Sequence, residues 1–105
     1  MNDRFLSMLG LCRKAGRLII GHDACMASII SGRAGLCMVC RDASERLKNE
    51  FKKAACYGGR ELPLAYIDYS MDDVQSVIGF RAGVFTIEDE GFLKKFFELV
   101  RSDKQ

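Results

Sequence analysis

The segment "GLCMVCRDAS", residues 35–44, decides the fold because it joins a continuous apolar run to an abruptly polar turn. The run "LCMVC" (36–40) has the length of a strand, and its lack of polar alternation predicts a strand that is covered on both faces. Asp42 and Glu45 then have capping-box spacing, which predicts a helix start. That helix would run through Leu47, Phe51, Ala54 and Ala55. A buried strand followed by a helix is typical of an α/β protein.

Working outward, glycines divide the chain into alternating helical and extended segments. Helices are predicted from Asn2 or Asp3 to Gly16, over 22–31, over 71–78 with Ser70 and Asp73 as a cap, and from about Asp89 through Val100. Further strands are predicted over 17–20, 62–67 and 84–87. This alternation predicts a three-layer α/β/α sandwich around a small, mixed, mostly four-stranded sheet.

Length and composition limit the class of protein. The 105 residues are enough for a single domain over 1–105, and 49% hydrophobic with 29% charged residues is globular composition. No apolar run approaches the roughly 20 residues of a membrane span, and no basic segment leads into an apolar one at the start. We therefore expect a cytoplasmic protein with no membrane partner.

The five cysteines raise the question of metal or redox chemistry. Cys37 and Cys40 form a C-x-x-C pair, but on a strand their side chains would point to opposite faces, whereas zinc ligands must converge. No second C-x-x-C pair accompanies them, so core packing is the favoured interpretation and no metal site is expected. A metal or redox protein remains the rival hypothesis for these thiols.

Nothing in the sequence demands an enzyme. His22 is the single histidine, and Cys25 follows one helical turn later, but no third orienting residue is visible for a Cys-His site. The glycines match neither the P-loop spacing nor the dinucleotide-binding spacing. We expect no catalysis, no cofactor and no small-molecule substrate.

Charge placement is more informative than the net charge of +2. Arg13, Lys14 and Arg17 cluster at the end of the first predicted helix, and Arg33, Arg41 and Arg81 each follow a predicted element. In an alternating α/β fold several of these turns can meet at one edge, where Gly21 would present the start of a helix to an anion. A phosphate-binding edge and ordinary surface arginines are both compatible with this pattern.

The stretch "LGLCRKAGRLIIGHDACMASIISGRAGLCMVCRDASERLKNEF" (9–51), with the tail "DEGFLKKFFELV" (89–100), resembles the ribosomal protein L7Ae family. It is particularly similar to a short bacterial branch of that family found near translation genes. The resemblance covers almost the whole chain, and it implies an α/β/α sandwich that binds kink-turn RNA.

The resemblance also implies an RNA-binding surface. Family members use a glycine at the start of the second helix, a polar pair that reads sheared G·A base pairs, and a lysine one turn later. Gly21 matches the glycine and Asp23 takes the first position of the pair, but Ala24 and Ala27 stand at the second position and at the lysine. The family's second RNA-facing segment, the loop before the last strand, corresponds here to "IGFRAG" (78–83).

These arguments lead to a hypothesis of a small RNA-binding protein associated with translation or with ribosomes. Its partners would be structured, kink-turn-like or ribosomal RNA and ribosomal proteins. The start of the predicted helix over 22–31 and the arginines would contact phosphates, while Phe80 would stack on an extruded base. The predicted RNA-binding residues are Lys14, Arg17, Gly21, His22, Asp23, Arg41, Phe80 and Arg81. The alternative hypothesis is a protein-interaction adaptor on the same fold that has lost kink-turn binding through Ala24 and Ala27.

Overall fold

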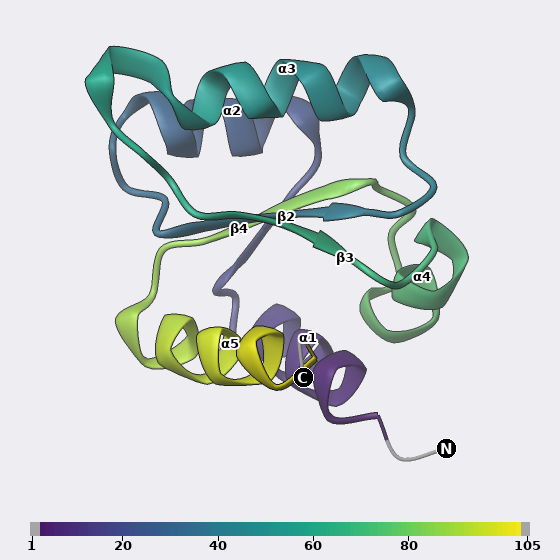
Figure 1. Cartoon of the computed structure of the whole chain (residues 1–105). Coiled ribbons are helices and arrows are strands. Elements are labelled where there is room, and N and C mark those ends of the chain that lie inside the picture. The colour runs from purple at the N-terminus through teal and green to yellow at the C-terminus, as the bar shows by residue number, and fades with distance from the viewer. Residues whose placement is uncertain (1–2, 104–105) are drawn as a thin grey trace.

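The computed structural model describes residues 3–103 and shows alternating helices and strands (Figure 1). The elements in chain order are α1 (Arg4–Lys14), β1 (Leu18–Ile20), α2 (His22–Ile30), β2 (Leu36–Cys40), α3 (Glu45–Ala55), a short 3-10 turn η1 (Tyr57–Gly59), β3 (Leu64–Ile67), α4 (Met71–Ile78), β4 (Val84–Ile87) and α5 (Glu90–Asp103). The alternation predicted from the sequence is confirmed. No helix in residues 3–103 is long and apolar enough to cross a membrane.

The four strands form one mixed sheet in the order β1-β4-β2-β3. β4 runs antiparallel to both β1 and β2, whereas β2 and β3 are parallel. The predicted four-stranded mixed sheet is therefore confirmed. Two of the predicted strands are shorter than expected, because β1 begins at Leu18 rather than residue 17 and β3 begins at Leu64 rather than residue 62.

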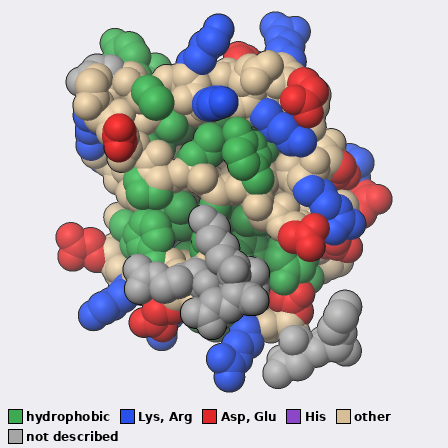
Figure 2. All heavy atoms as spheres, in the orientation of Figure 1, with side chains coloured by type: hydrophobic (Ala, Val, Ile, Leu, Met, Phe, Trp, Pro, Cys, Tyr) green, Lys and Arg blue, Asp and Glu red, His purple; other side chains and the backbone are tan. Residues whose placement is uncertain are grey.

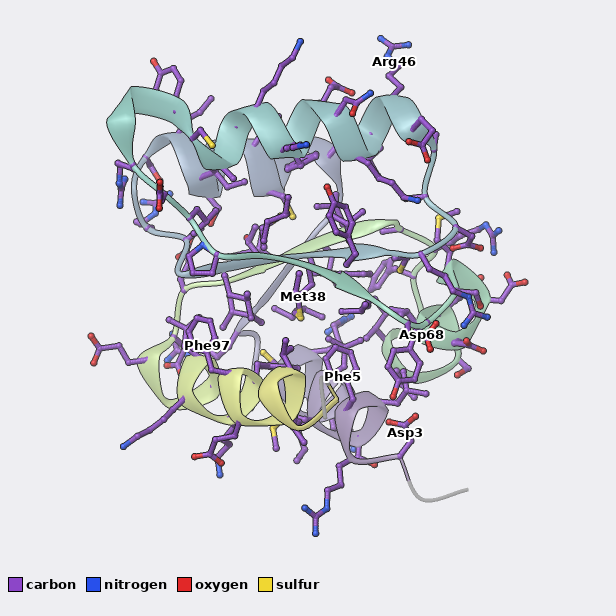
Figure 3. All side chains as sticks on the ribbon, viewed as in Figure 1. Asp3, Phe5, Met38, Arg46, Asp68 and Phe97 are labelled. Atoms are coloured by element: carbon purple, nitrogen blue, oxygen red, sulfur yellow. The ribbon has the colours of Figure 1, made fainter. Side chains whose placement is uncertain are left out.

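Helices cover both faces of the sheet, with α2 and α3 on one side and α1 and α5 on the other (Figure 1). The five residues of β2 are all buried, which explains why its sequence lacks an alternation of polar and apolar residues. Met38 and Cys40 belong to the cluster with α1, α4 and α5, whereas Cys37 and Val39 belong to the cluster with α2 and α3. Figure 3 shows Met38 pointing toward the α1 and α5 layer. The three-layer sandwich is confirmed.

Side chains cap four of the five helix starts. Asp3 accepts from Leu6 N at 3.0 Å at α1, and Ser70 with Asp73 forms the predicted capping box at α4. Asn2, the other predicted cap, lies outside the described residues. The remaining caps are Ser44 at α3, which accepts from Leu47 N at 3.1 Å, and Asp89 at α5, which accepts from Phe92 N at 3.0 Å.

The predicted capping box of Asp42 and Glu45 is wrong. Ser44 caps α3, and Asp42 accepts from Met71 N at 2.9 Å instead. The physical reason is tertiary: the turn after β2 lies against the start of α4, so the Asp42 carboxylate serves a helix that is 29 residues away in sequence.

α2 begins differently, at Gly21, which makes no side-chain cap hydrogen bond. Gly21 has φ 97° and ψ 164°, a backbone conformation that is essentially reserved for glycine. Its N–H donates to Val84 O at 3.2 Å, which fixes the turn between β1 and α2 against the start of β4. Among the five α-helix starts in residues 3–103, this one alone has no side-chain cap hydrogen bond.

Candidate nucleic-acid interface

The sheet has two ends that carry different side chains. At the Gly21 end, β1, β2 and β3 finish and β4 begins, with Cys40 N donating to Gly83 O at 2.9 Å. At the Gly35 end, β2 begins and β4 finishes, with Gly35 N donating to Ile87 O at 2.8 Å.

Six of the eight predicted RNA-binding residues lie at the Gly21 end. Gly21 and the first turn of α2 follow β1, Arg41 follows β2, and the loop 79–83 leads directly into β4. These six residues are Gly21, His22, Asp23, Arg41, Phe80 and Arg81. The structure thus brings together three segments that are distant in sequence and meet only because β4 lies between β1 and β2.

Arg41 and Arg81 are both held at the surface by carboxylates. Arg41 Nη1 donates to Asp68 O at 3.2 Å and to Asp68 Oδ1 at 3.1 Å, and Arg81 Nη1 donates to Asp72 Oδ1. Figure 3 shows Asp68 at the carboxyl end of β3. Exposed ion pairs contribute about 0–1 kcal/mol, so a phosphate can replace either carboxylate at small cost. Neither partner was visible in the sequence pattern.

Phe80 is half exposed, at 50% of its possible surface, and lies beside the last turn of α1. The guanidinium carbon of Arg13 lies 4.9 Å from the centre of the Phe80 ring, which is a cation–π contact. Lys14 lines the same shallow groove between α1 and α4 as Arg13 and Val77. Arg13 was outside the predicted site, although its place in the basic cluster of α1 was visible in the sequence.

His22 stands between two carboxylates at the start of α2. Its Nδ1 lies 2.9 Å from Asp23 Oδ1, and its Nε2 lies 3.1 Å from Glu50 Oε2 on α3. Hydrogen bonds to Asp23 and then to Glu50 raise the pKa of His22 above its ordinary value. Glu50 is a site residue that the sequence analysis missed, because only the packing of α3 beside α2 brings it near.

Arg17 is not brought to the Gly21 end. It precedes β1, and its Nε lies 4.0 Å from Asp89 Oδ1 at the Gly35 end. Arg33 lies at the same end, with its Nε 3.6 Å from Glu88 Oε2. The arginines of the predicted edge therefore divide between the two ends of the sheet, because β1 separates Arg17 from Gly21.

Ala24 and Ala27, which the family resemblance aligned with polar positions, are both exposed on α2. They offer no hydrogen-bonding side chain beside Asp23. The side-chain chemistry at this helix start is therefore limited to His22 and Asp23.

The cysteines behave as buried apolar side chains. Cys37 and Cys40 point to opposite faces of the sheet, as predicted. Burial raises the pKa of both thiols to about 12. Cys25 donates to Ile19 O at 3.4 Å and has its pKa raised to about 11 by burial, so it faces the sheet while His22 faces α3. Among residues 3–103 no three His, Cys, Asp or Glu side chains are grouped as metal ligands.

A separate apolar groove of about 590 Å³ runs along the β3 edge of the sheet. It is lined by Leu36, Pro63, Leu64, Ala65, Tyr66, Phe97 and Val100. Figure 2 shows hydrophobic side chains gathered on this face, between the upper helices and α5. The groove is an apolar surface distinct from the basic surface at the Gly21 end.

Fold and site together define a small α/β/α sandwich protein with a charged and partly aromatic surface at one end of its sheet. The sequence profile of the ribosomal protein L7Ae/L30e/S12e/Gadd45 family matches residues 3–97. The RNA-binding protein YlxQ of Enterococcus faecium is 35% identical over 98 residues, which cover 93% of this chain and 92% of that protein. The chain belongs to the ribosomal protein L7Ae/L30e/S12e/Gadd45 family, and the family resemblance seen in the sequence is confirmed.

Two solved structures share the fold. A protein of unknown function from Bacillus halodurans superimposes with a TM-score of 0.84 at 23% identity, covering 95% of this chain and 99% of that one. The Giardia lamblia 15.5kD RNA binding protein has a TM-score of 0.69 at 12% identity, covering 97% of this chain and 92% of that one. At these identities the likeness is one of fold.

Proposed function

We propose that this protein binds structured RNA of the kink-turn type through the Gly21 end of its sheet. The observation that carries the proposal is the uncapped start of α2, which lies at the same end as Arg41, Arg81 and the half-exposed Phe80. A helix start with free N–H groups attracts phosphate, and arginines strengthen that attraction. A family member of similar length, 35% identical to this chain, carries the name RNA-binding protein.

Each group has a distinct part in the proposed complex. The first N–H groups of α2 and the guanidinium groups of Arg41 and Arg81 contact phosphates, which fixes the position of the RNA. The ring of Phe80 stacks on an unpaired base, as aromatic side chains do in single-stranded RNA segments. Asp23 accepts from a guanine amino group, because an ionised carboxylate can only accept.

Ala24 and Ala27 shift the balance of this recognition. With no polar side chain at either position, the base pairs next to the kink are read less extensively than by a polar pair. Arginine contacts and the shape of the RNA then carry a larger share of the affinity. We further propose that the protein is non-enzymatic, works in the cytoplasm, and meets its RNA in translation or on ribosomal particles.

The test is a binding titration with a fluorescent kink-turn RNA and a fully paired duplex of equal length. We expect tighter binding of the kink-turn RNA, and an affinity for it that falls steeply with salt as counterions are released. The control variant Arg33→Ala should bind the kink-turn RNA as tightly as the wild type, because Arg33 lies at the Gly35 end. Equal affinity for both RNAs would limit the function to general RNA binding, and no salt-dependent binding to either would refute the proposal.

The second candidate function, a protein-interaction adaptor, is favoured by the apolar groove at the β3 edge. Tyr66 is 53% exposed and Phe97 is 36% exposed beside this groove, an apolar surface with no place in RNA binding. Affinity purification before and after ribonuclease treatment separates the two candidates. Partners that survive ribonuclease and are lost in Tyr66→Ser support the adaptor, whereas partners that all depend on RNA support RNA binding.

A further inference from the structure

We propose that His22 is a positioning residue whose protonation controls how tightly RNA binds at the start of α2. This inference rests on the proposed RNA-binding function, and it adds proton linkage to that same surface. Protonated His22 holds the carboxylates of Asp23 and Glu50 and offsets their charge, whereas neutral His22 leaves the helix start with excess negative charge beside the incoming phosphates.

The hydrogen bonds of His22 require both ring nitrogens to donate. Nδ1 lies 2.9 Å from Asp23 Oδ1 and Nε2 lies 3.1 Å from Glu50 Oε2, and an ionised carboxylate can only accept. A neutral imidazole has one N–H and can therefore satisfy only one of the two carboxylates. The ring also lies at 81° to the ring of Phe51, with centroids 5.5 Å apart, and this contact supports its orientation. The observed geometry belongs to the protonated ring.

The charged groups around His22 come from two helices. α2 contributes Asp23, and α3 contributes Glu50, whose Oε1 lies 4.0 Å from Arg46 Nε, while Lys53 lies one turn beyond Glu50 on the same helix. The strands packed against α2 add no charged group: "LII" of β1 and "VFTI" of β4 contain no ionisable side chain. Cys37 of β2 lies in the same apolar cluster as α2, and burial raises its pKa to about 12. Figure 3 shows Arg46 on the outer surface of α3 near its start.

Protonation changes the charge that RNA meets. The imidazole, Asp23, Glu50 and Arg46 together carry no net charge when His22 is protonated, and one net negative charge when it is neutral. The side chain of Asp23 is fully exposed and projects from the first turn of α2, where the proposed phosphate contacts lie. Phosphate therefore binds the protonated form better, and by linkage bound RNA holds the proton more tightly.

The direction of the pH effect follows from these facts. The two carboxylates raise the pKa of His22, so the protonated ring persists to higher pH than in an unfolded chain. RNA affinity is then highest below that pKa and falls as pH rises through it. Since the chain contains a single histidine, no other histidine can produce a transition in this range.

The experiment measures the Kd for a fluorescent kink-turn RNA between pH 5.5 and 7.5 at constant ionic strength. We expect Kd to increase about three- to tenfold across this range, as one charge near a phosphate predicts. In parallel, the NMR shift of the His22 ring proton gives its pKa with and without RNA, and we expect that pKa to rise on binding.

Three variants make the result specific. His22→Gln should bind with a Kd independent of pH. Glu50→Gln should move the midpoint of the transition to lower pH, because a neutral amide stabilises the protonated ring less than a carboxylate does. Glu61→Gln removes an exposed carboxylate at the Gly35 end and should reproduce the wild-type profile. Circular dichroism at each pH confirms that the variants are folded.

The outcomes separate this inference from the function on which it rests. Salt-dependent RNA binding with the same Kd at every pH, or with an unchanged pH profile in His22→Gln, overturns the proton linkage and leaves RNA binding intact. Absence of RNA binding at every pH overturns both proposals, even where NMR shows a raised pKa for His22. A profile that flattens only in His22→Gln establishes the linkage.

Discussion

The two ends of the sheet carry similar charges but differ in how their helices begin. At the Gly35 end, Asp89 caps α5, and two arginines, Arg17 and Arg33, are held by carboxylates. At the Gly21 end, Arg41 and Arg81 are held by carboxylates in the same way, but α2 begins without a side-chain cap. Paired arginines therefore do not distinguish the two ends, and the open helix start does.

This difference shows why charge alone is a weak guide to a binding surface. An arginine is available to phosphate at either end at similar cost, because exposed ion pairs contribute little. A carboxylate cap accepts from one of the first N–H groups and adds a negative charge at the helix start, so it competes with a phosphate for that position. If function follows the open helix start, changes at the Gly21 end should affect RNA binding and matched changes at the Gly35 end should not.

Thiol chemistry should distinguish the two ends most sharply. Cys56 is exposed at the end of α3, whereas Cys40 is buried directly before Arg41. With the pKa of Cys12, Cys37 and Cys40 raised to about 12 and that of Cys25 to about 11, their thiolate fractions at pH 8 are about one in a thousand or less. We expect a thiol reagent to label one cysteine per native molecule and five after denaturation.

Protein labelled at Cys56 also tests which surface binds RNA. Because Cys56 lies far from the Gly21 end along α3, labelled protein should bind RNA with unchanged affinity. Rapid labelling of Cys37 or Cys40 in the native protein would contradict their place in the core and would revive the metal or redox hypothesis.

Removing arginines from one end at a time compares the two surfaces directly. We expect Arg41→Ala with Arg81→Ala to weaken RNA binding roughly 10- to 100-fold, and to reduce the slope of log K against log salt by about two. The matched pair Arg17→Ala with Arg33→Ala removes the same charge at the Gly35 end and should leave both quantities near wild type. Equal losses in the two pairs would mean that RNA binding follows total charge.

Two glycines border the proposed RNA-binding surface, and they differ in backbone conformation. Gly21 has ψ 164° with positive φ, whereas Gly79 at the end of α4 is left-handed with φ 82° and ψ 1°. Asparagine tolerates the left-handed region but not the conformation of Gly21. Gly21→Asn should lower the free energy of unfolding by about 1–3 kcal/mol. Gly79→Asn should change it little, as urea denaturation will measure.

The smallest expected effect is a gain. Ala27 is exposed on α2, one turn beyond Asp23, so a lysine there would extend toward phosphates at the helix start. We expect Ala27→Lys to tighten kink-turn binding about three- to tenfold. Glu61→Lys at the Gly35 end serves as a stringent control, because it raises the net charge by two where Ala27→Lys raises it by one. An equal gain in the control would indicate a general charge effect.

The sequence predicted the order of elements because local signals determine them. The apolar run of β2, the Ser70 and Asp73 capping box and the glycine stops all act within a few residues. Asp42 shows the limit of such signals: its spacing suited a cap on α3, but its carboxylate bonds to the start of α4. Helix-capping patterns are ambiguous whenever two helix starts lie close together in space.

The candidate site was predictable only in part, for a similar reason. Gly21, Arg41 and Phe80 could be named because each follows a recognisable strand or helix. Arg17 is separated from them because it precedes β1, whereas Gly21 follows β1. The antiparallel pairing of β1 with β4 places the end of β1, and not its beginning, beside the loop that carries Phe80. Glu50 had no sequence signal, since its role beside His22 arises from helix packing across 28 residues.

The place of β4 in the sheet also constrains how the protein can fold. Within the described part of the chain, β1 is joined to the rest of the sheet only through β4, so the first strand to be synthesised has no strand partner until residues 84–87 have emerged. Pairings between such distant segments slow folding relative to proteins that have mainly local contacts. During synthesis, the edges of β1 and β2 therefore stay open to other chains until β4 is inserted between them and completes the sheet.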